Sequence, residues 1–144
     1  MRITTLSIAA LASISLLAAC NKAQSPQDVQ NNVAEARQDA NQKVDKAEQS
    51  GGKEVEEAQE DLNKASMSAN DKVTDKEKDM SSTQAAANYD VAVAKAEGDN
   101  KIAMAKCKSL SGDAQKACKQ SADAALESAK AQAAATRASQ TPQS

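Results

Sequence analysis

Residues 106–118 read Lys-Cys-Lys-Ser-Leu-Ser-Gly-Asp-Ala-Gln-Lys-Ala-Cys, and this stretch decides how the surrounding chain folds. In one straight helix, a rise of about 1.5 Å per residue would place Cys107 and Cys118 about 16 Å apart. A disulfide needs Cα atoms within about 7 Å of each other. A bonded pair therefore requires the chain to fold back between the cysteines, where Ser111, Gly112 and Asp113 lie.

Gly112 and Asp113 suit the turn that this reversal needs. Glycine readily takes the left-handed conformation just past a helix end, and aspartate is a favoured helix N-cap. We therefore predict a helix turn at Gly112 and Asp113, stapled by a Cys107–Cys118 disulfide that contributes about 3 kcal/mol. The alternatives are two free buried thiols or half of a metal site. The chain has no histidine, and two thiols at this spacing are not a structural zinc set, so we expect no metal.

Small apolar residues recur at helical spacing on both sides of the turn, and each cysteine lies on the inward face. We therefore predict a helical hairpin over residues 83–138, followed by a disordered tail over 139–144. The two inward stripes are Ala85, Tyr89, Ala92, Ala96, Ala103, Cys107 and Leu110 before the turn, and Ala114, Cys118, Ala122, Ala125, Leu126, Ala129 and Ala133 after it.

Residues 27–80 are predicted to form charged amphipathic helices, with Ser25 as N-cap and Pro26 at the first helical position. Gly51 and Gly52 together cost about 2 kcal/mol in a helix interior, so we expect a break there, either a hinge or a turn between antiparallel helices. A second weak point is expected over residues 79–83. Short Val-x-x-Ala motifs recur without a constant period, and heptads are not sustained. The apolar stripe comprises Val29, Val33, Ala36, Ala40, Val44 and Ala47, and resumes with Val55, Ala58, Leu62, Ala65, Ala69 and Val73.

The composition predicts an all-α chain of extended, weakly packed long helices that end in the stapled hairpin, without a compact globular core. After residue 20 there are 27 alanines but only 15 Val, Ile, Leu, Met and Tyr residues together. So few bulky apolar side chains offset little chain entropy, whereas Ala, Lys, Glu and Gln favour helices.

Several function classes are disfavoured by the residues present. Without histidine, neither a Ser-His-Asp nor a Cys-His arrangement can form. Paired carboxylates such as Glu56 and Glu57 lie on a heavily charged helix with no pocket to raise a pKa. No clustered basic face with stacking aromatics marks a nucleic-acid site. We therefore expect no enzyme activity, no cofactor and no nucleic-acid partner.

The N-terminal segment has the pattern of a secretory signal peptide over residues 1–19: one charge at Arg2, then an apolar run to Ala19. The run Leu17-Ala18-Ala19-Cys20 resembles the bacterial lipobox. That resemblance implies cleavage between Ala19 and Cys20, with a thioether-linked diacylglyceryl group and a fatty amide such as palmitate on Cys20. Residues 20–26 would be the lipidated N-terminus and a tether. The alternatives are an uncleaved membrane helix and a signal cut elsewhere.

The Cys-x10-Cys segment resembles a pattern in small proteobacterial envelope lipoproteins of unknown function, and the overall plan resembles murein-lipoprotein-type proteins. These resemblances imply a non-enzymatic lipoprotein that faces the periplasm of a Gram-negative bacterium and acts as a helical spacer or interaction module. Asn21 favours the outer membrane over the inner. The expected partners are the membrane, through the lipid on Cys20, and an envelope protein or peptidoglycan held non-covalently. A homo-oligomer is a further alternative. We expect the stapled hairpin at the end opposite the anchor. The alternative function is that of a stress-protective hydrophilic protein resembling late-embryogenesis-abundant proteins.

Overall fold

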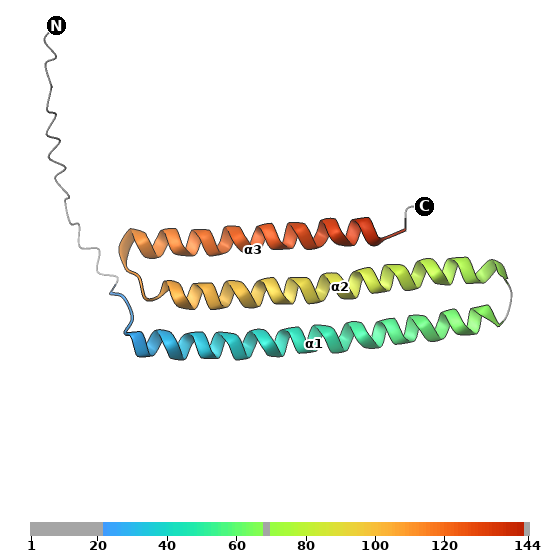
Figure 1. The fold of residues 1–144 in the computed structure, drawn as a ribbon, viewed down its shortest axis with the longest axis horizontal. Coiled ribbons are helices and arrows are strands. Elements are labelled where there is room, and N and C mark those ends of the chain that lie inside the picture. Colours follow the sequence, from blue (N-terminus) through green and yellow to red (C-terminus); the bar gives the residue numbers. More distant parts are fainter. Residues whose placement is uncertain (1–21, 68–69, 143–144) are drawn as a thin grey trace, which may run out of the picture.

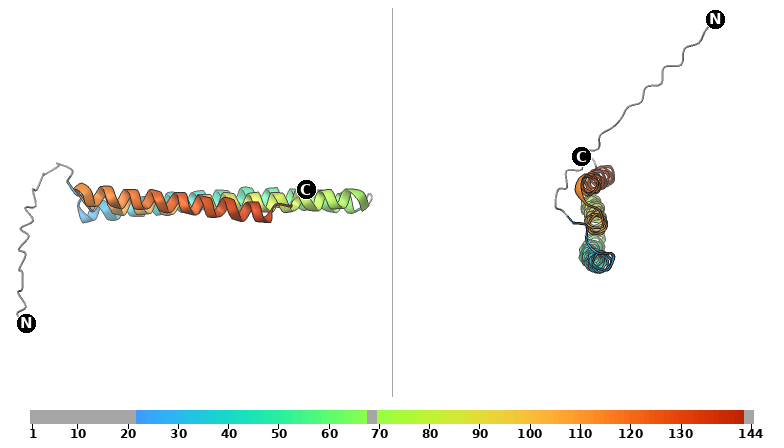
Figure 2. Two further views of the ribbon diagram at one scale, coloured as in Figure 1. Left: turned by 90° about the horizontal axis from the view of Figure 1, so that it is seen from above. Right: turned by 90° about the vertical axis from the view of Figure 1, so that its left-hand side faces the viewer.

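The computed structural model describes residues 22–67 and 70–142, which form three long α-helices and, within those ranges, no β-strand. α1 spans Pro26–Ser66, α2 spans Asn70–Cys107 and α3 spans Gly112–Gln140. The helices run antiparallel to their neighbours in one flat layer with α2 in the middle (Figures 1 and 2). Within the described ranges α2 contacts both other helices, and α1 does not contact α3. The all-α prediction is confirmed. The predicted signal peptide, with Ala19, Cys20 and Asn21, lies outside the described residues.

The start of α1 follows the sequence prediction. Ser25 is the N-cap, and its Oγ accepts a hydrogen bond of 3.2 Å from the backbone N–H of Asp28. Pro26 takes the first helical position, where its missing N–H leaves no hydrogen bond unmade. In the described part of the chain, no helix is both long and apolar enough to cross a membrane.

The predicted break at Gly51 and Gly52 is wrong, because α1 runs through both glycines without interruption. Gly51 lies against α2, where a Cβ added to it would come within 2.7 Å of the Ala87 Cβ. At Gly52 an added Cβ would meet nothing within 4 Å. Gly51 therefore serves close helix packing, and the chain instead reverses between Ser66 and Asn70.

The predicted weak points further along are also continuous helix, since α2 passes through residues 79–83 and through Gly98. Gly98 faces α1, and a Cβ there would lie 2.5 Å from the Ala40 Cβ. The expected division into segments 27–80 and 83–138 is therefore wrong, because α2 spans the boundary. Two glycine–alanine contacts, Ala40 with Gly98 and Gly51 with Ala87, instead define a seam between α1 and α2.

The seam residues lie eleven positions apart on each helix, at 40 and 51 on α1 and at 87 and 98 on α2. Eleven residues in three turns give about 3.67 residues per turn, close to the 3.6 of a straight α-helix. The seam can therefore follow both helices for three turns without the left-handed supercoiling that a heptad repeat imposes. Val33, Val44 and Val55 repeat at the same interval.

The α2–α3 pair uses the two alanine stripes predicted from the sequence. Ala85, Ala122 and Ala133 are buried, and Ala96, Ala103 and Leu126 line one small hollow between the helices. Leu110, however, is 39% exposed and lies in the turn. Arg137 stacks over the Tyr89 ring, with its guanidinium carbon 5.4 Å from the ring centroid.

The layer is held by small side chains. Among the described residues, the buried set consists of seven alanines, Gly51, Gly98, Cys107 and Gln115, whereas every Val, Ile, Leu, Met and Tyr whose burial is described is at least partly exposed. Alanine and glycine let helix backbones approach closely but bury little apolar area per residue.

Candidate functional site

The stapled turn between α2 and α3 is held by a covalent bond and by side-chain hydrogen bonds. The predicted Cys107–Cys118 disulfide is confirmed, with the two Cα atoms 5.7 Å apart. Cys107 is only 1% exposed. The disulfide closes the four-residue connection from both sides and fixes the start of α3 against the end of α2.

Gly112 has the predicted left-handed backbone, with φ at 56°. The predicted N-cap at Asp113 is wrong. Ser111 occupies the N-cap position of α3 without a side-chain capping hydrogen bond. Asp113 lies in the first turn, where the helix dipole stabilises its negative charge. Buried Gln115 donates from Nε2 to the Leu110 carbonyl at 2.8 Å and so ties α3 back to the turn.

The tether before α1 is bound to the same turn. The Gln24 backbone N–H donates to the Lys108 carbonyl at 2.9 Å. The Asn32 side chain completes the junction: its Nδ2 donates to Gln24 Oε1 at 3.0 Å, and its Oδ1 accepts from Lys108 Nζ at 3.4 Å. The tether and the stapled turn therefore lie at one end of the layer. The expectation that they lie at opposite ends is wrong, because the long α1–α2 hairpin returns the chain to its starting point.

The opposite end of the layer is made by α1 and α2 alone. The Ser81 hydroxyl donates to the Gln140 carbonyl at 3.3 Å, which places the end of α3 beside residue 81. Residues 58–66 of α1 and 70–80 of α2 therefore project beyond α3, and we call this part the hairpin tip (Figure 1). Its chain turn includes Met67, which is 89% exposed.

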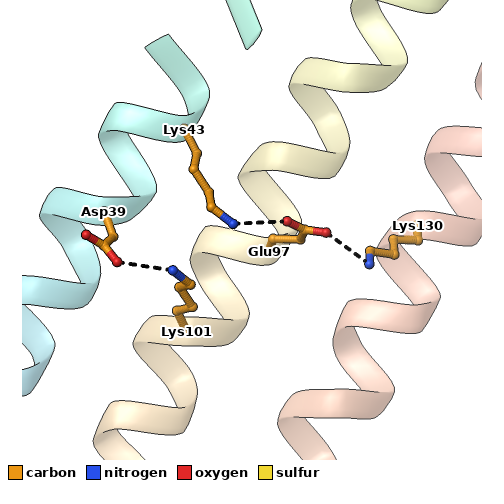
Figure 3. Close-up of polar contacts among 5 residues, drawn as sticks. All are labelled: Asp39, Lys43, Glu97, Lys101 and Lys130. Carbon is orange, nitrogen blue, oxygen red and sulfur yellow. Dashed lines mark hydrogen bonds and ion pairs between the residues drawn. The ribbon is translucent and has the colours of Figure 1, made fainter. Parts of the chain in front are cut away.

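One side of the layer carries ion pairs that join all three helices (Figure 3). Glu97 on α2 is 3.4 Å from Lys43 Nζ on α1 and 3.2 Å from Lys130 Nζ on α3. A second pair joins Lys101 to Asp39 at 3.1 Å. The hydrogen bond from Lys130, supported by Lys43, lowers the pKa of Glu97 below its ordinary value of 4.5, against a smaller opposing effect of burial. Glu97 therefore stays ionised and links α1 to α3, which do not touch each other.

The side of the layer on which a residue lies follows from its distance in sequence from a seam residue. At 100° per residue, a residue three positions after a seam residue and one four positions after it fall on opposite sides of the seam. The first set is Lys43, Glu54, Asp90 and Lys101; the second is Val44, Val55, Val91 and Ile102. We call these sides the charged face and the apolar face.

A groove marks each face. The groove on the charged face has a volume of about 510 Å³ and is lined by Glu54, Glu57, Asp61, Lys76 and Asp79, among others. Two adjoining hollows on the apolar face, of about 250 and 480 Å³, share Val55, Gln84 and Asn88. Glu48 is the one charged residue that lines these two hollows. We call the two hollows together the amide groove.

The sequence pattern does not indicate the ion pairs of Glu97 or the contacts of the tether with the stapled turn. Lys43 and Glu97 are 54 residues apart, and nothing in their spacing marks them as partners. The signal in the sequence is the eleven-residue interval, which is shared by Ala40 and Gly51 on α1 and by Ala87 and Gly98 on α2. In the described ranges no group of three or more His, Cys, Asp and Glu residues could hold a metal ion.

Comparison with known proteins found no relative of this chain. The chain matches no protein-family model, and no curated protein or solved structure matches it either.

Proposed function

We propose that this chain is a non-enzymatic lipoprotein of the bacterial outer membrane, held at the periplasmic side by a lipid on Cys20 and serving as a helical spacer or interaction module. The observation that carries the proposal is the 2.9 Å hydrogen bond between Gln24 and Lys108, which binds the tether to one end of a long layer. A lipid on residue 20 would then lie only four residues before Gln24, and so close to this end of the layer.

The geometry supports a spacer because the far end of the layer is held away from the tether. α1 has 41 residues. At about 1.5 Å per residue it spans about 60 Å. Ion pairs join the two helices of the hairpin tip, with Lys76 lying 3.7 Å from Asp61 on the other helix and 3.4 Å from Asp79 on its own. The anchored protein would therefore present the tip, rather than the stapled turn, to an envelope protein or to peptidoglycan.

The lipobox and the pairing of the other two cysteines support lipidation of Cys20. Cys107 and Cys118 bond to each other, which leaves Cys20 as the one remaining cysteine of the sequence. Stable membrane attachment needs two or more acyl chains, and a lipidated N-terminal cysteine carries them.

Mass spectrometry of the protein purified from membranes tests the proposal. The expected product begins at Cys20, carries a diacylglyceryl thioether and a fatty amide, and retains the Cys107–Cys118 bond. Cys20→Ser is the matched variant and should leave the chain unprocessed or released from the outer-membrane fraction. An N-terminus elsewhere without acyl groups, or unchanged fractionation of Cys20→Ser, would refute the anchored function.

A further inference from the structure

The apolar face of the α1–α2 pair has bulky side chains that the described chain does not cover. Val44, Val55, Val91 and Ile102 each follow a seam residue by four positions and are only half-buried. Val55 and Val91 line the same hollow, so the valines of the two helices project to one side of the layer. α3 contacts α2 but not α1, and its last residue, Gln140, lines one end of the amide groove, so α3 leaves the rest of the strip above the seam uncovered.

We propose that the occupant of this apolar face is a second copy of the chain, packed face to face to give a dimer with a four-helix centre. The inference is independent of the proposed function, except for the parallel orientation, which rests on the membrane anchor.

The spacing of the bulky residues makes the face complementary to itself. Ala40 meets Gly98 and Gly51 meets Ala87, so Val44 lies at the level of Val91, within a few residues along the axis. The same pairing brings Val33 to the level of Ile102 and Val55 to the level of Met80. A two-fold axis along the helices would superpose these levels on those of the partner, because α1 of one copy then lies over α2 of the other. Three apolar layers would form, about 16 Å apart.

Charged residues at the edge of the apolar face are complementary between two copies. Arg37 precedes Ala40 by three positions and Asp99 follows Gly98 by one, so both lie toward the apolar face at the same level. With α1 lying over the partner's α2, Arg37 of each copy would meet Asp99 of the other. An antiparallel copy would bring α1 over α1 instead and would pair Arg37 with Glu48 and Asp99 with Lys95, because Glu48 and Lys95 also precede seam residues by three positions. The choice of the parallel arrangement therefore rests on the membrane anchor. The charged face, by contrast, uses Lys43, Glu97 and Lys130 within one chain.

The available area meets the requirement of a specific interface at its lower limit. A strip about 60 Å long and about 10 Å wide on each copy would bury about 1,200 Å² in total. Amide side chains flank the strip at Gln59, Gln84 and Asn88, where they can hydrogen-bond at the rim.

Photo-crosslinking of the full chain in cells tests the proposal directly. A photoreactive phenylalanine analogue is placed at exposed Asn88 in the amide groove or, as matched control, at exposed Glu54 in the charged groove. Position 88 should give a product of twice the chain's mass, at least tenfold more abundant than that from position 54. No dimer from position 88, equal dimer from both positions, or a product containing a different protein overturns the proposal.

Two further measurements fix the face and the orientation. Val44→Lys or Val91→Lys should lower the dimer yield from position 88 at least tenfold at unchanged helicity, whereas Asp90→Lys on the charged face should not change it. A probe at Gln59 should cross-link within the partner's hairpin tip. Cross-links from Gln59 to the partner's tether end would overturn the parallel orientation, and an undiminished yield in both lysine variants would overturn the apolar face as the interface.

Discussion

Replacement of Gly51 by alanine tests the seam between α1 and α2, with its neighbour Gly52 as an internal control. The two glycines share the same helix and the same sequence surroundings. They differ in that a Cβ on Gly51 would approach the Ala87 Cβ to 2.7 Å, whereas one on Gly52 would meet no atom within 4 Å. The variants Gly51→Ala and Gly52→Ala therefore separate helix propensity from packing.

The expected magnitudes follow from these distances. Alanine stabilises a helix interior by about 1 kcal/mol relative to glycine, and Gly52→Ala should gain that amount. At position 51 the same gain is opposed by overlap, because carbon atoms normally lie about 3.5–4 Å apart. The helices would have to separate by about 1 Å, and such overpacking costs about 1–3 kcal/mol. Gly51→Ala should thus be neutral to about 2 kcal/mol destabilising.

Thermal unfolding of the full chain, followed by circular dichroism, measures the difference. Each kcal/mol should shift the midpoint by about 3–6 °C for a chain of this size. The swapped variant Gly51→Ala with Ala87→Gly moves the methyl group to the other side of the contact and should unfold within about 0.5 kcal/mol of the wild type, below the cost of overpacking. If Gly51→Ala stabilised the protein as much as Gly52→Ala, the seam would not exist as described.

Three other changes have expected outcomes. Cys118→Ser should lower the free energy of unfolding by about 3 kcal/mol, measured by denaturant titration, since the disulfide closes a short loop; an unchanged midpoint would show that the staple contributes nothing. Glu97→Gln removes two partly exposed ion pairs and should cost about 0.5–1 kcal/mol. Because the folded pKa of Glu97 is lowered, its contribution is fully present above pH 4.5 and is lost as the pH falls through the folded value. The difference between wild type and Glu97→Gln should therefore shrink in acid, and a constant difference from pH 6 to about 3 would contradict the assignment. Ser25→Ala removes the N-cap of α1 and should cost about 1 kcal/mol, seen as faster amide exchange over its first turn; unchanged exchange would exclude a capping role.

The helical class, the α1 cap and the stapled turn could be predicted from the sequence because each is encoded locally. Ser25 and Pro26 adjoin the helix that they start. Cys107 and Cys118 are separated by so few residues that a bond between them requires a turn at Gly112. Local propensity and covalent geometry were sufficient for these features.

The long-range features could not be predicted because local rules gave the opposite answer. Two adjacent glycines favour a helix break on propensity alone, yet the packing of Gly51 on Ala87 keeps the helix intact. The end at which the stapled turn lies depends on where α1 reverses. That reversal follows Ser66 and carries no glycine or proline signal. The Glu97 ion pairs depend in turn on the register that the seam sets.

The distance between position 67 at the tip and position 109 in the stapled turn tests the central claim most directly. Spin labels introduced as non-canonical amino acids leave the native disulfide intact, and the full chain is measured in membranes. A continuous α2 beside a continuous α1 predicts one narrow distance distribution near about 60 Å. A chain that is disordered when hydrated, as the stress-protective alternative requires, would give a broad distribution centred near about 35 Å, which would contradict a rigid spacer.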